Sequence, residues 1–204
     1  MEFLYPFIIA FLFVFISELG DKTQLLVLSF SNKTKPFFIL FGVALGSLFS
    51  HGIAILFGSS IGLFENETIH TFFEIVTYST FLLFGILCFV PKKENKENCK
   101  NKKSSLFNKL ALFRFGYVFL IAFSIAIGEF GDKTFLASIG LGISYPYYKL
   151  PLILGCISGM VLSDSIAIIF GKFLHKYISE NAMQKLSGVL FIIFGIIGFI
   201  PLFL

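Results

Sequence analysis

The motif E-x-G-D-K-T decides the fold, and the chain carries it twice, as E-L-G-D-K-T at residues 18–23 and E-F-G-D-K-T at residues 129–134. The two copies are 111 positions apart, and both lie inside long apolar segments. A carboxylate at the centre of a membrane span costs about 2.5–3.5 kcal/mol, so acidic residues there normally line a polar pathway. The duplicated motif therefore predicts a membrane protein whose ion-handling site is made by two related halves.

Two further blocks repeat in the same order as the motif. Residues 42–58 (G-V-A-L-G-S-L-F-S-H-G-I-A-I-L-F-G) match residues 155–171 (G-C-I-S-G-M-V-L-S-D-S-I-A-I-I-F-G), with eight of 17 positions identical. Residues 84–91 (F-G-I-L-C-F-V-P) match residues 194–201 (F-G-I-I-G-F-I-P). Each copy holds three apolar segments, so the second copy must enter the membrane from the opposite side. This is the inverted-repeat plan of many secondary transporters, whose sites lie near the midplane where the repeats meet.

The composition is that of a protein with several membrane spans. Of the 204 residues, 56% are hydrophobic and 14% are charged, whereas a soluble domain has about 25% charged residues. A helix needs about 20 apolar residues to cross the hydrocarbon core, and six segments reach this length: 3–29, 36–60, 70–90, 113–140, 150–171 and 185–203. We therefore predict an all-α membrane protein with six transmembrane helices, arranged as two inverted three-helix repeats over residues 1–91 and 111–204.

The first and fourth segments are longer than one crossing needs, and we expect each to tilt or to break at the glycine of its motif. The N-terminal segment lacks the basic start and the cleavage site of a signal peptide, so we expect it to be kept as the first span. The net charge of +4 comes from basic loops and gives no reason to expect nucleic-acid binding, because membrane topology explains it.

The basic residues predict the orientation in the membrane. Thirteen of them fall in loops on one side, namely Lys33, Lys35, Lys92, Lys93, Lys96, Lys100, Lys102, Lys103, Lys109, Arg114, Lys172, Lys176 and Lys185. The other side has only Lys149. Because basic loops stay in the cytoplasm, we expect both termini outside the plasma (inner) membrane. The 91–110 loop is then cytoplasmic, and residues 92–110 form a basic linker between the repeats.

Five carboxylates are predicted to lie within the spans. Residues three apart share a helix face, and each motif contains such an acidic pair. Inverted symmetry would bring the two faces together, so the candidate metal ligands are Glu18, Asp21, Glu129 and Asp132. Asp164 is the fifth carboxylate, in the middle of the fifth span, and its repeat partner in the second span is His51.

Polar neighbours could complete or tune this site. The candidates for supporting or coupling roles are Thr23, Gln24, Thr134, Asp164, Ser47, Ser50, Ser163 and His51. Lys22 and Lys133 would balance charge by pairing with neighbouring aspartates, or would extend to the membrane interface. The G-x-x-x-G pairs at 42–46 and 155–159 predict close helix packing around these residues.

A cluster of carboxylate oxygens suits hard divalent cations such as Mg²⁺, Ca²⁺ or Mn²⁺. The residues favour an exchanger of such cations, and they leave two alternatives: a divalent-cation channel, or an exporter of small organic cations or amino acids. The organic exporter would need a roomier, partly apolar pocket, and the carboxylate density and the absence of Trp argue against it. We expect neither an enzyme nor a cofactor, because the chain contains no H-E-x-x-H and no G-x-S-x-G.

The paired motifs, each in the first helix of a three-span repeat, resemble the GDT family of cation/proton exchangers, which includes Golgi manganese and calcium transporters and bacterial manganese exporters. The resemblance extends over essentially the whole chain and looks like a short bacterial form. In that family the acidic residues of both motifs form the cation site, which here implies Glu18, Asp21, Glu129 and Asp132, with Thr23 and Thr134 as supporting ligands. The resemblance implies Mn²⁺ or Ca²⁺ as the transported ion.

Counting charges predicts an exchange with protons. If all five carboxylates were ionised they would carry −5, the two motif lysines would reduce this to −3, and one divalent cation would reduce it to −1. Without the cation, so much negative charge is unfavourable in a low-dielectric site, so we expect the empty site to take up protons. Metal needs ionised ligands and should expel these protons. An inward proton gradient would then drive metal export from one central site.

Overall fold

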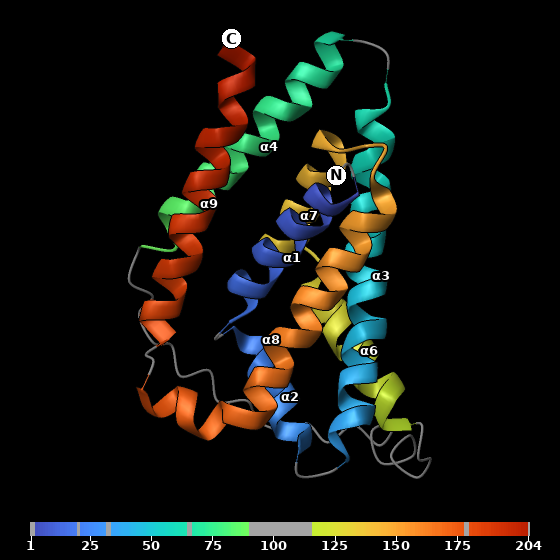
Figure 1. Cartoon of the computed structure of the whole chain (residues 1–204), viewed down its shortest axis with the longest axis vertical. Helices are drawn as coiled ribbons and strands as arrows, with labels where there is room; N and C mark the ends of the chain where they lie inside the picture. The colour runs from blue at the N-terminus through green and yellow to red at the C-terminus, as the bar shows by residue number, and fades with distance from the viewer. Residues whose placement is uncertain are drawn as a thin grey trace.

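The structure is a computed structural model of the chain, and it describes residues 3–19, 21–31, 34–64, 67–89, 116–177 and 180–203. The predicted linker 92–110 lies outside these residues. Every regular element in the described ranges is an α-helix (Figure 1). The helices are α1 (Leu4–Glu18), α2 (Lys22–Ser31), α3 (Pro36–Gly62), α4 (Glu67–Leu87), α6 (Gly116–Glu129), α7 (Lys133–Ser144), α8 (Lys149–Tyr177) and α9 (Glu180–Phe203).

The two long apolar segments are broken at their motifs, as the sequence allowed. The helix α1 ends at Glu18 and α2 begins at Lys22, while α6 ends at Glu129 and α7 begins at Lys133. In the second break, Gly131 has φ of +80°, a conformation that residues with a Cβ rarely adopt. The break therefore interrupts the helix inside the motif and leaves the acidic residues at helix ends.

The other boundaries differ from the predicted spans by a few residues. The helix α3 begins at Pro36, where a missing N–H costs nothing, and continues to Gly62, two residues beyond the prediction. The helix α8 continues to Tyr177, and α9 begins at Glu180, five residues before the predicted start. At the end of α8 and the start of α9 the helix continues through polar residues beyond the apolar run, so the predicted spans were too short there.

By length and composition, two described helical stretches could each cross a membrane, Pro36–Gly62 and Lys149–Ile169. Four shorter apolar helices accompany them: Leu4–Glu18, Thr71–Leu87, Gly116–Glu129 and Gly188–Ile200. Two of the shorter helices, α1 and α6, are short because the motif break ends them. The all-helical prediction is confirmed, and six crossings in two inverted repeats remain a prediction.

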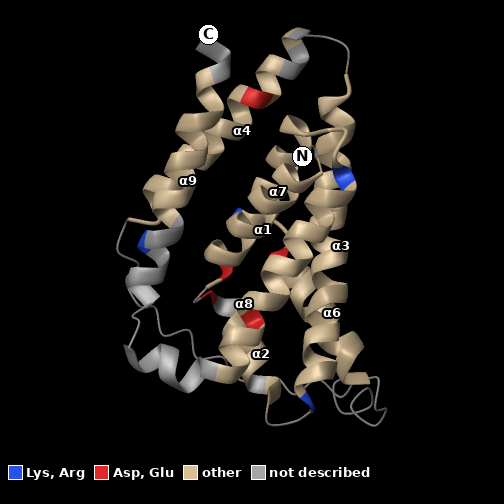
Figure 2. Cartoon of the chain, viewed as in Figure 1, with Lys and Arg blue, Asp and Glu red and all other residues tan. Residues whose placement is uncertain are grey.

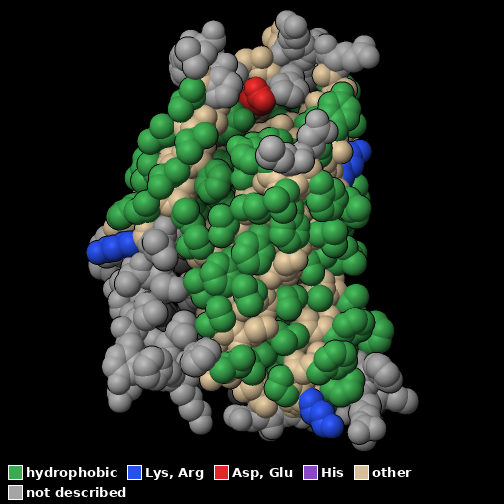
Figure 3. All heavy atoms as spheres, in the orientation of Figure 1, with side chains coloured by type: hydrophobic (Ala, Val, Ile, Leu, Met, Phe, Trp, Pro, Cys, Tyr) green, Lys and Arg blue, Asp and Glu red, His purple; other side chains and the backbone are tan. Residues whose placement is uncertain are grey.

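The surface agrees with a lipid environment. Large hydrophobic side chains are exposed on most helices, including Phe37 on α3, Phe123 on α6 and Ile169 on α8. Figure 3 shows hydrophobic side chains covering most of the visible side of the molecule, with few charges between them. Soluble monomers rarely expose apolar surface on this scale.

Helices from the two halves of the chain interleave. The helix α1 packs mainly against α8, α3 against α6 and α7, and α4 against α9. In Figure 1, the beginning of α1 and the end of α9 lie toward the same end of the bundle, and the end of α2 and the beginning of α3 lie at the opposite end. Each half of the chain therefore buries its helices largely against helices of the other half.

The G-x-x-x-G pairs lie at two equivalent contacts between these halves. A Cβ at Gly46 would lie 2.7 Å from the carbonyl oxygen of Ala122 on α6, and a Cβ at Gly159 would lie 2.6 Å from that of Phe11 on α1. Phe11 and Ala122 are 111 positions apart, the same offset as the two motifs. The glycines thus allow α3 and α8 to approach α6 and α1 at related positions, as the pattern predicted.

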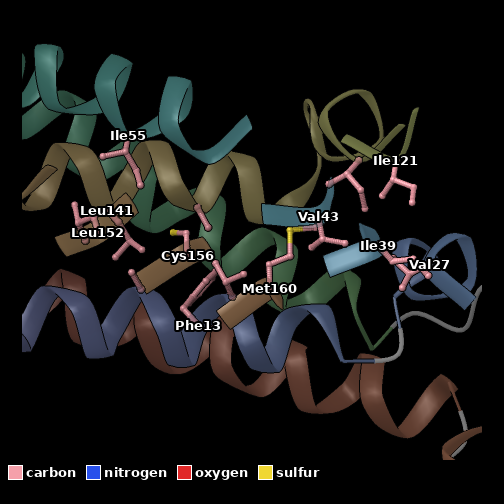
Figure 4. Packing of buried hydrophobic residues seen from close by; sticks show 14 of the residues in the cluster. Phe13, Val27, Ile39, Val43, Ile55, Ile121, Leu141, Leu152, Cys156 and Met160 are labelled. Atoms are coloured by element: carbon pink, nitrogen blue, oxygen red, sulfur yellow. The ribbon is translucent and has the colours of Figure 1, made fainter. Parts of the chain in front are cut away.

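The apolar core lies between these helices. Phe13 of α1 packs edge-on against Phe191 and Phe194 of α9, with ring centroids 4.8 and 5.1 Å apart. Figure 4 shows Phe13 together with Cys156 and Met160 of α8 in the same interior. The core holds α1 against α8, and so holds the C-terminal end of α1 in position.

Candidate functional site

Three carboxylates from both halves of the chain meet at the helix breaks. Glu18 at the end of α1, Glu129 at the end of α6, and Asp132 just before α7 each place one oxygen within 4.8 Å of the others. Both glutamates are 1% exposed. Figure 2 shows acidic residues gathered at mid-height of the bundle, where α1 meets α2 beside α8. Three of the four carboxylates that the motif predicted to converge are therefore brought together, and the fourth, Asp21, is not part of this group.

The same hydrogen bond orients each glutamate. Thr23 Oγ1 donates to Glu18 Oε2 over 3.0 Å, and Thr134 Oγ1 donates to Glu129 Oε2 over 2.9 Å. Glu18 Oε1 is buried and has no hydrogen-bond partner within the described part of the chain. The threonines of the motif thus orient one oxygen of each glutamate, and the second oxygen of Glu18 is available to bind a cation.

Asp21 lies beside the three-carboxylate group in an ion pair. Its Oδ2 is 3.2 Å from Lys133 Nζ, so the pair joins the two motifs. The sequence left open whether this lysine pairs with its neighbouring aspartate or reaches the interface, and the structure pairs it with the aspartate of the other copy. Charge balance by Lys133 is thus visible, whereas the side chain of Lys22 lies outside the described residues.

Asp164 and His51 are both buried, at 1% and 0% exposure. Asp164 Oδ2 has no hydrogen-bond partner among the described residues. His51 Nδ1 is 2.8 Å from Ser138 Oγ, whose single hydrogen is directed to the Thr134 carbonyl oxygen, also over 2.8 Å. With the Ser138 hydrogen on that carbonyl oxygen, His51 Nδ1 is the donor to Ser138 Oγ, and His51 Nε2 has no hydrogen-bond partner among the described residues.

The remaining supporting candidates have different roles. Gln24 Nε2 donates to Ser163 Oγ over 2.8 Å and to the Ser163 carbonyl oxygen over 3.2 Å, which ties α2 to α8. Ser50 Oγ donates to the Gly46 carbonyl oxygen within its own helix. Ser47 Oγ is buried and has no partner in the described part of the chain. Of these serines, only Ser163 is seen to hold a residue from a motif helix.

Two polar residues near the site were missed by the sequence analysis. Ser138 connects His51 to Thr134, and Ser17 places a buried hydroxyl directly before Glu18. Ser138 lies four residues after Thr134 and so on the same helix face, which could have indicated it. Neither serine belongs to the duplicated motif, so the duplication does not indicate them.

The geometry suits one hard divalent cation. Two oxygens on opposite sides of such an ion are separated by twice the metal–oxygen distance, about 4–5 Å for bonds of about 2.1–2.6 Å, and the three carboxylate oxygens lie within that limit. The carbonyl ends of α1 and α6 also reach the group, and their partial negative charge attracts cations. The arrangement can hold a cation between the two halves of the protein.

Comparison with known proteins agrees with this geometry. The family described as "Divalent cation/proton antiporter GDT1" matches residues 6–96 and 118–203 of the chain. The chain belongs to the GDT1 family. Exchange of divalent cations for protons is thus its transport class, which confirms the resemblance and sets aside the channel, the organic-cation exporter and an enzyme.

Curated GDT1 relatives come from bacteria and plants. The chain is 24% identical to a Vibrio cholerae protein named "Putative manganese exporter", over 90% of this chain and 84% of that protein. It is 25% identical to a GDT1-like protein of Synechocystis, over 92% and 93%. GDT1-like protein 5 of Arabidopsis thaliana is 45% identical over 40% of this chain and 36% of its own length. No solved structure is significantly similar to the chain.

Proposed function

We propose that this GDT1 antiporter exports Mn²⁺, with Ca²⁺ as the next candidate, from the cytoplasm in exchange for protons. The proposal rests on the three-carboxylate group at the helix breaks, which offers only oxygen from acidic side chains. Such ligands suit Mn²⁺ and Ca²⁺. The name of the Vibrio cholerae relative supports manganese and export.

The proposed ligands are Glu18, Asp21, Glu129 and Asp132. Three of them already share a volume that fits one ion. Asp21 would join them by leaving its ion pair with Lys133, which is partly exposed and so not locked in place. Thr23 and Thr134 hold the glutamates in the required orientation. The lysine then acts as an internal cation that balances charge while the site is empty.

We further propose six membrane crossings in two inverted repeats, residues 1–91 and 111–204, joined by the cytoplasmic linker 92–110. In support, the glycines of α3 and α8 contact α6 and α1 at positions related by the repeat offset. The beginning of α1 and the end of α9 also lie toward one end of the bundle (Figure 1). The thirteen basic residues on the other side favour termini outside the plasma (inner) membrane.

Proton entry would supply the driving force for export. Moving a divalent cation out against an inside-negative potential costs about 4.6 kcal/mol per 100 mV, since each charge costs about 2.3. At least two entering protons would offset this electrical cost. Carboxylates that bind the ion only when ionised couple the two flows, because metal binding displaces protons.

The test uses the purified protein in liposomes that contain a pH-sensitive dye. Addition of Mn²⁺ outside should drive Mn²⁺ in and protons out, and an imposed pH gradient should change the Mn²⁺ flux. Parallel runs with Ca²⁺ and Mg²⁺ rank the ions. Metal flux without proton movement, and without sensitivity to the gradient, would contradict the proposed exchange.

A further inference from the structure

Asp164 is a buried carboxylate that the proposed cation site does not use. It lies on α8 and is 1% exposed, and it is not part of the group formed by Glu18, Glu129 and Asp132. Its Oδ2 has no hydrogen-bond partner among the described residues. An ionised carboxylate without a partner is very costly to bury, and such a group is stable there when it carries a proton.

The position of Asp164 is fixed by its neighbours. Gln24 holds Ser163, the preceding residue, through two hydrogen bonds, one to its hydroxyl and one to its backbone carbonyl. This contact anchors α8 to α2, directly after the first motif. The backbone beside Asp164 is therefore anchored to the helix that follows the first motif, while Asp164 is not part of the three-carboxylate group.

The surroundings of Asp164 contain groups that respond to a bound cation. The titratable groups with described side chains on the helices that pack against α8 are Tyr5 and Glu18 on α1, His51 on α3, and Lys133 on α7. Asp164 interacts electrostatically with Glu18 and with Glu129 of α6. A negative charge on Asp164 and negative charges on these two glutamates therefore oppose one another.

We propose that Asp164 carries one of the exchanged protons at a site separate from the residues that hold the cation. This inference rests on the proposed exchange of Mn²⁺ for protons. When the divalent cation binds, its positive charge favours the Asp164 carboxylate, and one proton leaves its carboxyl oxygen for water. When the cation has left on the opposite side of the membrane, Asp164 regains one proton from water there. No bond other than this O–H bond is formed or broken.

The chemistry of the repeat partner fits this division of roles. The equivalent residue in the first half is His51, whose Nδ1 is committed to Ser138. The ring thus supports Thr134 and, through it, Glu129. The two halves place a titratable side chain at the same position. His51 has a hydrogen bond through Nδ1, whereas Asp164 Oδ2 has none among the described residues.

The experiment counts the protons released when Mn²⁺ binds. Isothermal titration of the purified, full-length protein with Mn²⁺, in two buffers of different protonation enthalpy, gives the number of protons per ion. The variant Asp164→Asn keeps the size of the neutral side chain but cannot release a proton. Asp164→Glu keeps an exchangeable proton, and Glu74→Gln on α4 removes one acidic group away from the site as a matched control.

We expect Asp164→Asn to bind Mn²⁺ and to release one proton fewer than the natural sequence. Within the pH range where Asp164 titrates, the Mn²⁺ affinity of Asp164→Asn should rise with each pH unit by a factor tenfold smaller than that of the natural sequence. Asp164→Glu and Glu74→Gln should release the natural number. An unchanged proton count in Asp164→Asn would overturn the inference, and so would loss of Mn²⁺ binding in the folded variant, since Asp164 would then be a ligand.

Two further measurements keep the inference separable from the proposed function. If Asp164→Asn does not insert and fold, Asp164→Ser offers a second neutral side chain with the same expected count. If the natural protein binds no Mn²⁺, or binds it without releasing protons, the proposed function fails before Asp164 is tested. A natural protein that exchanges normally, beside an Asp164→Asn variant with the same proton count, contradicts only the inference.

Discussion

Replacing Gly46 with alanine tests the helix contact that positions Glu129. The new Cβ would lie 2.7 Å from the carbonyl oxygen of Ala122 and 2.8 Å from Cβ of Ile125, both on α6. Real Cβ atoms essentially never approach other atoms to less than 3.0 Å, so α6 must move away by several tenths of an ångström. Overpacking of this kind costs about 1–3 kcal/mol.

Gly52→Ala is the matched control for this substitution. Gly52 is buried on the same helix, and the nearest atom to its added Cβ is Leu48 Cδ1, at 3.9 Å. Both substitutions gain the same helix propensity, about 1 kcal/mol, so their difference isolates the overpacking. A difference of about 1–3 kcal/mol corresponds to a Tm lower by about 2–12 °C for Gly46→Ala in a protein of this size.

The assays are thermal unfolding of the purified variants in detergent and Mn²⁺ uptake in liposomes. Because Glu129 is the last residue of α6, displacement of this helix should also raise the KM for Mn²⁺ in Gly46→Ala. Equal Tm values and equal uptake in the two variants would refute the reasoning, since the close approach of α3 and α6 would then carry no energy.

Three further outcomes are expected. The double variant Glu18→Gln, Glu129→Gln should insert normally and lose Mn²⁺ uptake, because one proposed carboxylate ligand in each half becomes neutral. Normal uptake would exclude both glutamates as ligands. Lys133→Gln should lower the Kd for Mn²⁺, measured by titration, about 2- to 5-fold. In the natural protein the ion must displace the Lys133 ammonium from Asp21, an ion pair worth about 0.5–1 kcal/mol. Lys133→Arg keeps this ion pair and should leave the Kd unchanged. An impermeant thiol reagent should label Cys99 only after cells are permeabilised, and labelling of intact cells would reverse the predicted orientation.

The sequence predicted those parts of the structure that are formed by repeated sequence motifs. The repeated E-x-G-D-K-T motif indicated both helix breaks and the meeting of acidic residues from the two halves. The G-x-x-x-G pairs indicated which helix faces pack closely. Both predictions succeed for physical reasons. A charge inside an apolar helix is costly unless it lines a polar site, and a glycine there allows another helix to approach closely.

The sequence could not predict contacts that join residues of different helices without a repeat. Lys133 pairs with Asp21 of the other motif, although Asp132 is its neighbour in the chain. Sequence spacing does not show which aspartate lies within reach of the ammonium. The bond between His51 and Ser138 was equally invisible. Ser138 corresponds to Val27 in the first half, so comparison of the repeats gave no reason to single it out.

The two halves agree in the proposed ion ligands and differ in the residues that link the helices. The helix α7 is tied to α3 by the hydrogen bond between Ser138 and His51, and α2 is tied to α8 by the bonds between Gln24 and Ser163. Each contact links the second part of a broken helix to the second span of the other half, with different chemistry on the two sides.

This difference is compatible with alternating exposure of one site. Two conformations exchange readily when their free energies lie within a few kcal/mol, and buried hydrogen bonds of neutral groups contribute about 0.5–1.5 kcal/mol each, whichever groups form them. The anchoring contacts therefore need similar strength and not identical residues. The ion, in contrast, must be bound from both sides by ligands of one kind, so a symmetric exchanger is free to vary its anchors but is expected to keep Glu18 and Glu129, with their threonines, as matching pairs.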